Sequence, residues 1–241
     1  MSDLCKWLHE QLEQLPLVAF PFALESLPQN GTYFVYERGE TWGHGGSVPR
    51  IVRIGGHTGQ GNFPRRINDH YLADDMAMDF GRNSRKPADA SIFRKNIGRV
   101  LLDLDGDPYL DIWDIDFTYN DKRESSGHRR NIDKEKRLES EITAILRQTT
   151  SFRFIVVDDQ DERRELEKHM IGTVAQCAVC TPSENWMGRH SPKPKIAGGK
   201  LWQERQLTAG PIDLGDQEGI LNAIGRTKRW IAGSACGQTL R

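Results

Sequence analysis

The sequence lacks a hydrophobic segment long enough to cross a membrane. Its longest apolar run, LPLVAFPFAL at residues 15–24, contains two prolines and is far shorter than the roughly 20 residues that a spanning helix needs. The run follows a charged stretch with helical periodicity, which differs from the basic start of a signal peptide. We therefore expect a cytoplasmic protein with no membrane partner.

Cysteine is also scarce. Four cysteines in 241 residues are too few for a disulfide scaffold, and two of them lie near the chain ends. Cys177 and Cys180 form a CxxC pair, but a zinc site needs a second pair of ligands, and the nearby candidates are His169 and His190. Because free cysteines are commonly buried, we favour two small apolar residues near the end of a helix, and leave metal binding open.

An excess of one charge sign is absent as well, since the net charge is −1. A balanced chain is not typical of a protein that coats nucleic acid, but the distribution of charge matters more than its total. Basic residues gather at 82–99, 128–137 and 189–200, and acidic residues gather at 103–116. Such segregation either lines a groove for phosphates or reflects ordinary solvated surfaces.

The acidic segment DLDGDPYLDIWD, which begins at residue 103, lacks the glycine spacing of a calcium loop. Its glycine is the fourth residue instead of the sixth, where Pro108 stands. We therefore exclude calcium and predict a strand over YLDIWDIDF, preceded by a DGDP turn.

Hydrophobic periodicity predicts an α/β (α+β) fold with a small, largely antiparallel, three-stranded sheet flanked by helices. Strands are expected near 32–37, 50–55 and 152–159, because these segments are rich in β-branched and aromatic residues. Helices are expected near 3–14, 63–72, 90–102, 133–148 and 161–178, with a last helix over EGILNAIGRTKRWIAG.

Residues that suit phosphate chemistry gather around the first two predicted strands. GTYFVY at 31–36 supplies Tyr33, and VRIGG at 52–56 ends in two glycines directly before His57. In RRINDHY, Arg66 and His70 are four residues apart and project from one face of a helix. An arginine can bind a phosphate while a tyrosine or histidine moves a proton, and one carboxylate for a divalent metal would complete the site.

These residues resemble the GIY-YIG nucleases, which carry Gly-x-Tyr, Tyr-x-Gly and Arg-x-x-x-His in that order. The corresponding residues here are Gly31-Thr32-Tyr33, Arg53-Ile54-Gly55, and Arg66 with His70. Further along, SIFRKNIGRVLL, ERRELEKHMIG and NWMGRHSPKPKIAGGKLWQ follow the pattern of a bacterial branch with restriction-endonuclease-like members. The resemblance covers roughly residues 30–205, and several motifs in one order are more specific than any one alone.

The resemblance implies a metal-dependent active site. Glu167 corresponds to the glutamate that binds the metal, which would be Mg²⁺ or Mn²⁺. Tyr33 would position or deprotonate the attacking water, with His70 or His57 assisting. Arg66 would hold the scissile phosphate and stabilise its charge.

Three positions qualify this assignment. On composition alone, Glu165 competes with Glu167, although it lies on a different helical face. Arg53 replaces the second motif tyrosine, as in the bacterial branch, and Gln203 stands where that branch usually has asparagine. The residues expected to contact DNA are Arg53, Arg94, Lys95, Arg99 and Gln203.

The expected organisation is a nuclease-like domain at 29–210, with a basic insertion at about 75–130 and helical extensions at 1–28 and 211–241. The implied function is a metal-dependent endonuclease acting on double-stranded DNA. Restriction is one candidate biological role, and a homodimer is one candidate oligomeric state. A non-catalytic DNA-binding module on the same fold is the main alternative, and a small-molecule phosphoesterase is a weaker one. The sequence does not specify which DNA sequence is preferred.

Overall fold

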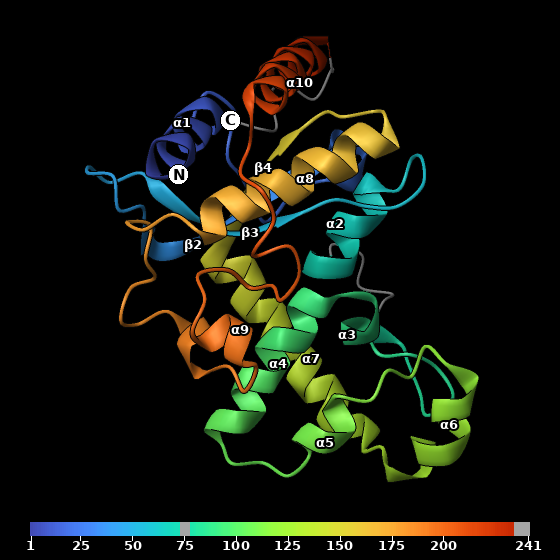
Figure 1. Ribbon diagram of the computed structural model, residues 1–241. Helices are drawn as coiled ribbons and strands as arrows, with labels where there is room; N and C mark the ends of the chain where they lie inside the picture. The colour runs from blue at the N-terminus through green and yellow to red at the C-terminus, as the bar shows by residue number, and fades with distance from the viewer. Residues whose placement is uncertain (73–77, 234–241) are drawn as a thin grey trace.

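A four-stranded antiparallel sheet forms the centre of the protein (Figure 1). The structure is a computed structural model that describes residues 1–72 and 78–233. The strands are β1 (Val18–Ala19), β2 (Thr32–Thr41), β3 (Pro49–Gly55) and β4 (Thr150–Ile155), in the order β1-β4-β2-β3 across the sheet. The expected α/β class with a small antiparallel sheet is confirmed, and β1 adds an edge strand to the three that were predicted.

Helices cover both faces of this sheet (Figure 1). The α-helices are α1 (Ser2–Leu12), α2 (Phe63–Tyr71), α3 (Pro87–Ala90), α4 (Ile92–Leu104), α5 (Leu110–Trp113), α6 (Asn120–Ser126), α7 (Ile132–Thr149), α8 (Gln160–Ala175), α9 (Pro194–Ala197) and α10 (Leu214–Gly233). Short 3-10 helices are η1 (Leu24–Ser26), η3 (Gly127–Arg129) and η4 (Met187–His190). Of the helices in residues 1–72 and 78–233, none has the length and apolar composition that crossing a bilayer requires.

Side-chain caps fix where three of the longer helices begin. Ser91 caps α4, Asn131 caps α7 and Asp159 caps α8, each by accepting a hydrogen bond from a backbone N–H of the first turn. The strand predicted at 152–159 is shorter at its C-terminal end than expected. It ends at Ile155, because Asp159 is the N-cap residue of α8 and does not belong to the strand.

Both faces of the sheet are buried, which explains the unbroken run of buried aromatic and apolar residues at 33–36 in β2. Along β2, Tyr33 and Val35 belong to one core, whereas Phe34 and Tyr36 belong to the other. Side chains of α2, α4 and α7 complete the first core, and those of α1, α8 and α10 complete the second. The sheet is therefore the middle of three layers.

The two terminal helices help to form the second core. Leu8 of α1 and Ile220 of α10 are fully buried, and α1 packs against both α8 and α10. Residues 234–241 of the predicted C-terminal extension lie outside the described residues, as do residues 75–77 of the predicted insertion.

The acidic segment after α4 is helical at α5, which corrects the strand predicted for YLDIWDIDF. Trp113 is fully buried, and its indole N–H donates to the carbonyl oxygen of Lys95 at 3.0 Å. Gly98 of α4 makes room for it, because a Cβ there would lie 2.4 Å from the Trp113 ring. The local pattern suited a strand, but packing of this tryptophan against α4 favours a helical turn.

The basic side chains of α4 are turned into the protein. Arg94 is fully buried and forms a salt bridge of 2.7 Å with Glu139 on α7. Lys95 and Arg99 are 6% and 7% exposed and pair with aspartates. This burial does not support the expected contact of these three residues with DNA. The Arg94 salt bridge joins α4 to α7, whereas the partners of Lys95 and Arg99, Asp89 and Asp114, lie within the predicted insertion.

We expect Arg94→Ala to destabilise the protein instead of weakening DNA binding. The substitution leaves Glu139 buried without its cation, which typically costs about 3–5 kcal/mol of unfolding free energy. Urea unfolding followed by circular dichroism measures this loss. Combining Arg94→Met with Glu139→Leu removes both charges and should be clearly more stable than Arg94→Ala. A variant of unchanged stability but weakened DNA affinity would show that Arg94 does contact DNA.

Candidate active site

The last residue of β3 lies opposite a tyrosine in the sheet. Gly55 pairs with Tyr33 of β2, and a Cβ at Gly55 would lie 2.3 Å from the Tyr33 hydroxyl oxygen. Real side chains do not tolerate that distance, so the absence of a Cβ allows Tyr33 to cross this position. The first of the paired glycines therefore places a tyrosine hydroxyl, itself buried, at the end of β3.

The second glycine makes room for a carboxylate. A Cβ at Gly56 would lie 2.6 Å from Oε2 of Glu167 on α8, and the Gly56 N–H donates a hydrogen bond to that carboxylate. Burial raises the pKa of Glu167, while nearby arginines and this hydrogen bond oppose the shift. The Tyr33 hydroxyl and the Glu167 carboxylate thus approach two consecutive glycines.

Glu167, and not Glu165, is the carboxylate of α8 that faces this strand end. Glu165 is exposed and forms a 3.0 Å salt bridge with Lys168. Glu167 is half-buried, and within residues 1–72 and 78–233 it forms no salt bridge. Of the two glutamates, Glu167 is thus the one on the helix face that meets Gly56, and its role as the metal ligand stays a prediction.

Tyr33 belongs to a chain of hydrogen bonds with His70 and Ser91. The Tyr33 hydroxyl lies 2.6 Å from His70 Nε2, and His70 Nδ1 lies 2.6 Å from the Ser91 hydroxyl. Burial is the main cause that lowers the pKa of His70 well below its ordinary value, and nearby arginines add to the effect. A neutral imidazole keeps one nitrogen that can accept a proton, so His70 can both orient the tyrosine hydroxyl and take up its proton.

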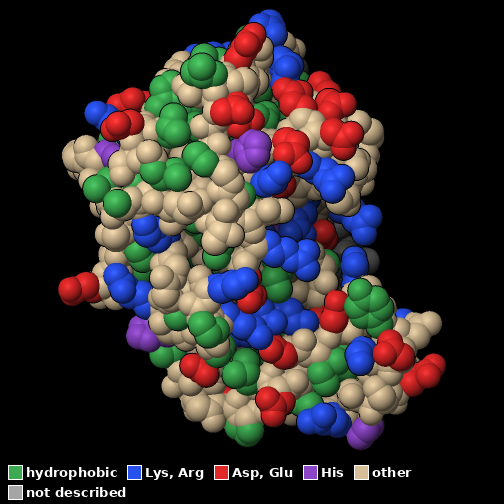
Figure 2. All heavy atoms as spheres, viewed as in Figure 1, with side chains coloured by type: hydrophobic (Ala, Val, Ile, Leu, Met, Phe, Trp, Pro, Cys, Tyr) green, Lys and Arg blue, Asp and Glu red, His purple; other side chains and the backbone are tan. Residues whose placement is uncertain are grey.

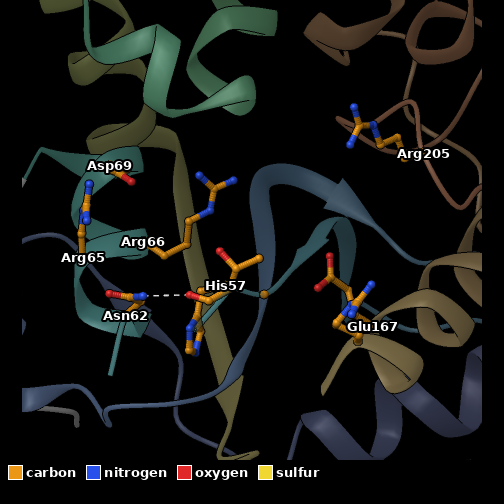
Figure 3. A pocket seen from close by; sticks show the side chains of 10 residues that line it. His57, Asn62, Arg65, Arg66, Asp69, Glu167 and Arg205 are labelled. Atoms are coloured by element: carbon orange, nitrogen blue, oxygen red, sulfur yellow. Dashed lines mark hydrogen bonds between the residues drawn. The ribbon is translucent and has the colours of Figure 1, made fainter. Parts of the chain in front are cut away.

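An open cleft of about 520 Å³ borders Gly56. Figure 3 shows Arg65, Arg66 and Asp69 on α2 at one side of it, and Glu167 and Arg205 at the other. An adjoining hollow of about 760 Å³ shares Glu167 and Arg205 with this cleft. On the face of the protein seen in Figure 2, Lys and Arg side chains gather around a hollow in the middle. The cleft therefore combines an attractive surface for phosphates with two carboxylates, Glu167 and Asp69.

His57 holds the loop that follows β3. Its Nε2 accepts a hydrogen bond from the Gly31 N–H at 3.2 Å, and its ring points away from the Arg66 guanidinium (Figure 3). Burial and the charge of Arg163 lower the pKa of His57 to about 4. Arg163 also donates to the carbonyl oxygens of His57 and Gly59, which fixes the path of the loop. These contacts give His57 a positioning role in addition to its place in the cleft lining.

Residues around Trp202 extend the edge of β3. The Trp202 N–H donates to the Val52 carbonyl at 2.8 Å, and the side-chain oxygen of Gln203 accepts from the Ile54 N–H at 3.0 Å. Arg53 donates to the Trp202 carbonyl at 2.7 Å. Arg53 and Gln203 are 5% and 9% exposed but line the second hollow, so their first role is to hold this wall in place.

Residues 5–220 match the family described as GIY-YIG domain. The chain belongs to the GIY-YIG family. Comparison with curated proteins and comparison with solved structures each gave no match. The two motif strands of this GIY-YIG chain are β2 and β3, which pair directly. A GIY-YIG domain points to endonuclease activity and hence to DNA as the substrate.

The GIY-YIG cleft also contains residues that are not among the predicted site residues, chiefly Arg65, Asp69 and Arg205. Arg65 and Asp69 are four residues apart in RRINDHY, as are Arg66 and His70, so the helical spacing already carried this signal. Burial raises the pKa of Asp69, and Arg66 and Arg65 oppose that shift. Arg205 lies in an irregular segment, where spacing in the sequence predicts no location.

We expect the contribution of His57 and His70 to the unfolding free energy to fall as the pH is lowered from about 6.5 to about 5. The pKa values of His57 and His70 lie below the ordinary histidine value, so the unfolded chain binds protons that the folded chain does not. Each such proton contributes a slope of up to about 1.4 kcal/mol per pH unit. Urea unfolding at a series of pH values measures it. His70→Gln should flatten the slope whatever its effect on absolute stability, whereas His128→Gln, at an exposed site, should leave it unchanged. An unchanged slope in His70→Gln would show that the pKa of His70 does not differ between the folded and unfolded protein.

Proposed function

We propose that this protein is a divalent-metal-dependent endonuclease that hydrolyses phosphodiester bonds in double-stranded DNA. The observation that carries the proposal is the approach of the Tyr33 hydroxyl and the Glu167 carboxylate to Gly55 and Gly56. Arg66 lines the same cleft as Glu167. A proton acceptor, a metal ligand and a cation for the phosphate are the components that this reaction needs.

Glu167 fits a hard divalent cation such as Mg²⁺ or Mn²⁺. Its carboxylate borders both hollows and is not neutralised by a salt bridge within the described residues. A single carboxylate suits Mg²⁺, because this ion usually keeps several of its waters. When bound, the ion would supply positive charge beside the scissile phosphate. It would also offset the cost of an ionised carboxylate in a partly buried position.

Tyr33 and His70 are the groups that we propose move a proton. Hydrolysis joins a water oxygen to phosphorus and breaks the bond from phosphorus to a sugar oxygen, which leaves with the bonding electron pair and takes a proton from solvent in the open cleft. The proton of the water would pass to the Tyr33 oxygen as Tyr33 gives its own proton to His70 Nε2, 2.6 Å away. Since Tyr33 is buried, the gap left by Gly55 is the route that we assign for its hydroxyl to meet the cleft.

Arg66 is the proposed ligand of the scissile phosphate. One of its N–H groups donates to the Ala90 carbonyl at 2.9 Å, which steadies the guanidinium at the cleft. A guanidinium has five N–H donors, so others remain for a phosphate. One charge-stabilising contact of this kind is typically worth about 3 kcal/mol in the transition state. Arg65, Arg164 and Arg205 would hold neighbouring phosphates.

A DNA-binding module without turnover is the second candidate, because the arginines of the cleft would attract DNA without a metal. A small-molecule phosphoesterase is not favoured, since charged side chains dominate the cleft lining and such ligands usually bind in an enclosed apolar pocket. Restriction would be the sequence-specific form of the proposed endonuclease.

We expect Glu167→Gln to abolish DNA cleavage while DNA binding is kept or tightened. The change removes the proposed metal ligand and one negative charge from the cleft. The matched control is Glu165→Gln on the same helix, which should cleave like the wild type because Glu165 is exposed and paired with Lys168. Cleavage of sequence-diverse DNA with Mg²⁺ or Mn²⁺, with and without EDTA, and binding by fluorescence anisotropy measure the two effects.

Two outcomes would decide against catalysis at Glu167. Cleavage at the wild-type rate by Glu167→Gln would remove its role in metal binding. A wild type that binds such DNA tightly but leaves it intact with either metal would favour the binding module instead.

We expect Gly56→Ala to lower cleavage strongly, by about a hundredfold or more, since the new Cβ would overlap the position of Glu167 Oε2 and displace the carboxylate. Gly81→Ala is the matched control, because its Cβ would meet no atom within 4 Å. The ratio of the two cleavage rates, at matched circular dichroism spectra, measures the effect. Equal rates would mean that the carboxylate does not need its present position.

A further inference from the structure

Three cysteines and one histidine meet away from the candidate active site. Their ligand atoms, the sulfurs of Cys5, Cys177 and Cys180 and a ring nitrogen of His44, all lie within 4.8 Å of one another. The three cysteines are buried and His44 is half-buried. None of the four lines the cleft or its adjoining hollow.

The four residues come from three separate parts of the chain. Cys5 lies on α1, His44 lies in the connection between β2 and β3, and the cysteine pair follows α8. The candidate partners near this pair in the sequence are His169 and His190. His169 instead contacts Asp216 at 2.8 Å, which leaves Cys5 and His44 as the partners that the fold supplies.

The backbone is shaped to bring these segments together. A Cβ at Gly43 would lie 1.7 Å from the Val179 carbonyl oxygen, so glycine is required where the loop before His44 meets the turn of the cysteine pair. The Lys200 ammonium donates a hydrogen bond to the Cys177 carbonyl. That contact places a positive charge beside a cluster that would become negative when its thiols ionise.

His9 supports the cluster without joining it. Its Nδ1 contacts the Cys5 carbonyl at 2.8 Å, and its Nε2 accepts from the Ile51 N–H at 3.2 Å. Both ring nitrogens are therefore engaged with backbone groups, which fixes Cys5 relative to β3. Trp42 packs edge-on against the His44 ring, with 5.1 Å between ring centroids. Supports of this kind around the ligands are typical of a metal site.

We propose that Cys5, His44, Cys177 and Cys180 form a structural zinc site. Zinc–sulfur bonds of about 2.3 Å and zinc–nitrogen bonds of about 2.0 Å in a tetrahedron put the ligand atoms about 3.5–3.8 Å apart, so the observed limit of 4.8 Å requires only a small contraction. Thiolates and imidazole suit zinc and not Mg²⁺. Four protein ligands leave no position for a substrate, which identifies a structural and not a catalytic ion. The ion would tie α1 and the β2–β3 connection to the end of α8.

Metal analysis of the full chain tests this site. Protein made in zinc-supplemented medium, and purified under reducing conditions without chelator or histidine tag, should contain close to one zinc ion per chain. After zinc removal, added Co²⁺ should give the visible spectrum of a tetrahedral thiolate site. Both measurements use the wild type, so they do not depend on the solubility of any variant. Reduced wild-type protein that holds no zinc and gives no tetrahedral Co²⁺ spectrum would overturn the proposal, as would a disulfide between two of these cysteines in freshly purified protein.

Variants assign the ligands. Cys180→Ser and His44→Ala should each lower zinc affinity at least about tenfold, and His44→Cys should restore binding because thiolate is also a zinc ligand. The matched controls are Cys236→Ser, at the fourth cysteine of the chain, and His128→Ala, at an exposed histidine; both should keep their zinc. Glu167→Gln should also keep it, which separates this site from the proposed catalytic metal. Zinc loss in the controls equal to that in Cys180→Ser would refute the assignment.

Discussion

The candidate active site depends on the absence of a Cβ at two consecutive positions where β3 ends. Successive residues of a strand face opposite sides of a sheet, and in this protein both sides are covered by helices. Gly55 opens the side from which Tyr33 arrives, and Gly56 admits Glu167 of α8. A single glycine would make space on only one side of the sheet. Two in succession allow groups from both layers to approach adjacent residues at the end of β3, while the strands behind them stay buried.

The sequence was sufficient to predict the parts of the site that are local. The spacing of Arg66 and His70 on one helix, the aromatic strand with Tyr33 and the paired glycines all lie within short segments, where periodicity constrains direction. Glu167 is distant in the sequence, and its selection came from the order of family motifs. The structure places it beside Gly56, whereas Glu165 points to solvent. Composition alone could not separate these two glutamates.

Long-range partners account for what the sequence did not predict. Arg94 is a basic residue of the kind that often binds DNA. Its carboxylate partner Glu139 is 45 residues away in the sequence, and the two meet because α4 packs on α7. Trp113 similarly forms its helical turn because Gly98 of α4 receives its ring. Cys177 lies near Cys5 of α1 and near His44 of the β2–β3 connection. Both residues are too far from it in the sequence to belong to one local motif. In each case the deciding interaction lies between elements that the sequence keeps far apart.

The charges in the cleft couple the binding of DNA to the binding of the divalent metal in the proposed endonuclease. Burial disfavours the charged form of Glu167, and the positive charges of Arg53 and Arg66 compensate in part. A phosphate that pairs with Arg66 would cancel some of that compensation and leave the carboxylate more in need of a cation. A divalent metal at Glu167 would in turn lower the repulsion between the carboxylate and the phosphate. DNA and metal should therefore each favour binding of the other, because the same few charges serve both. A cleft with arginines alone would bind DNA without this coupling. The half-buried Glu167 carboxylate among the arginines therefore favours catalysis over DNA binding alone.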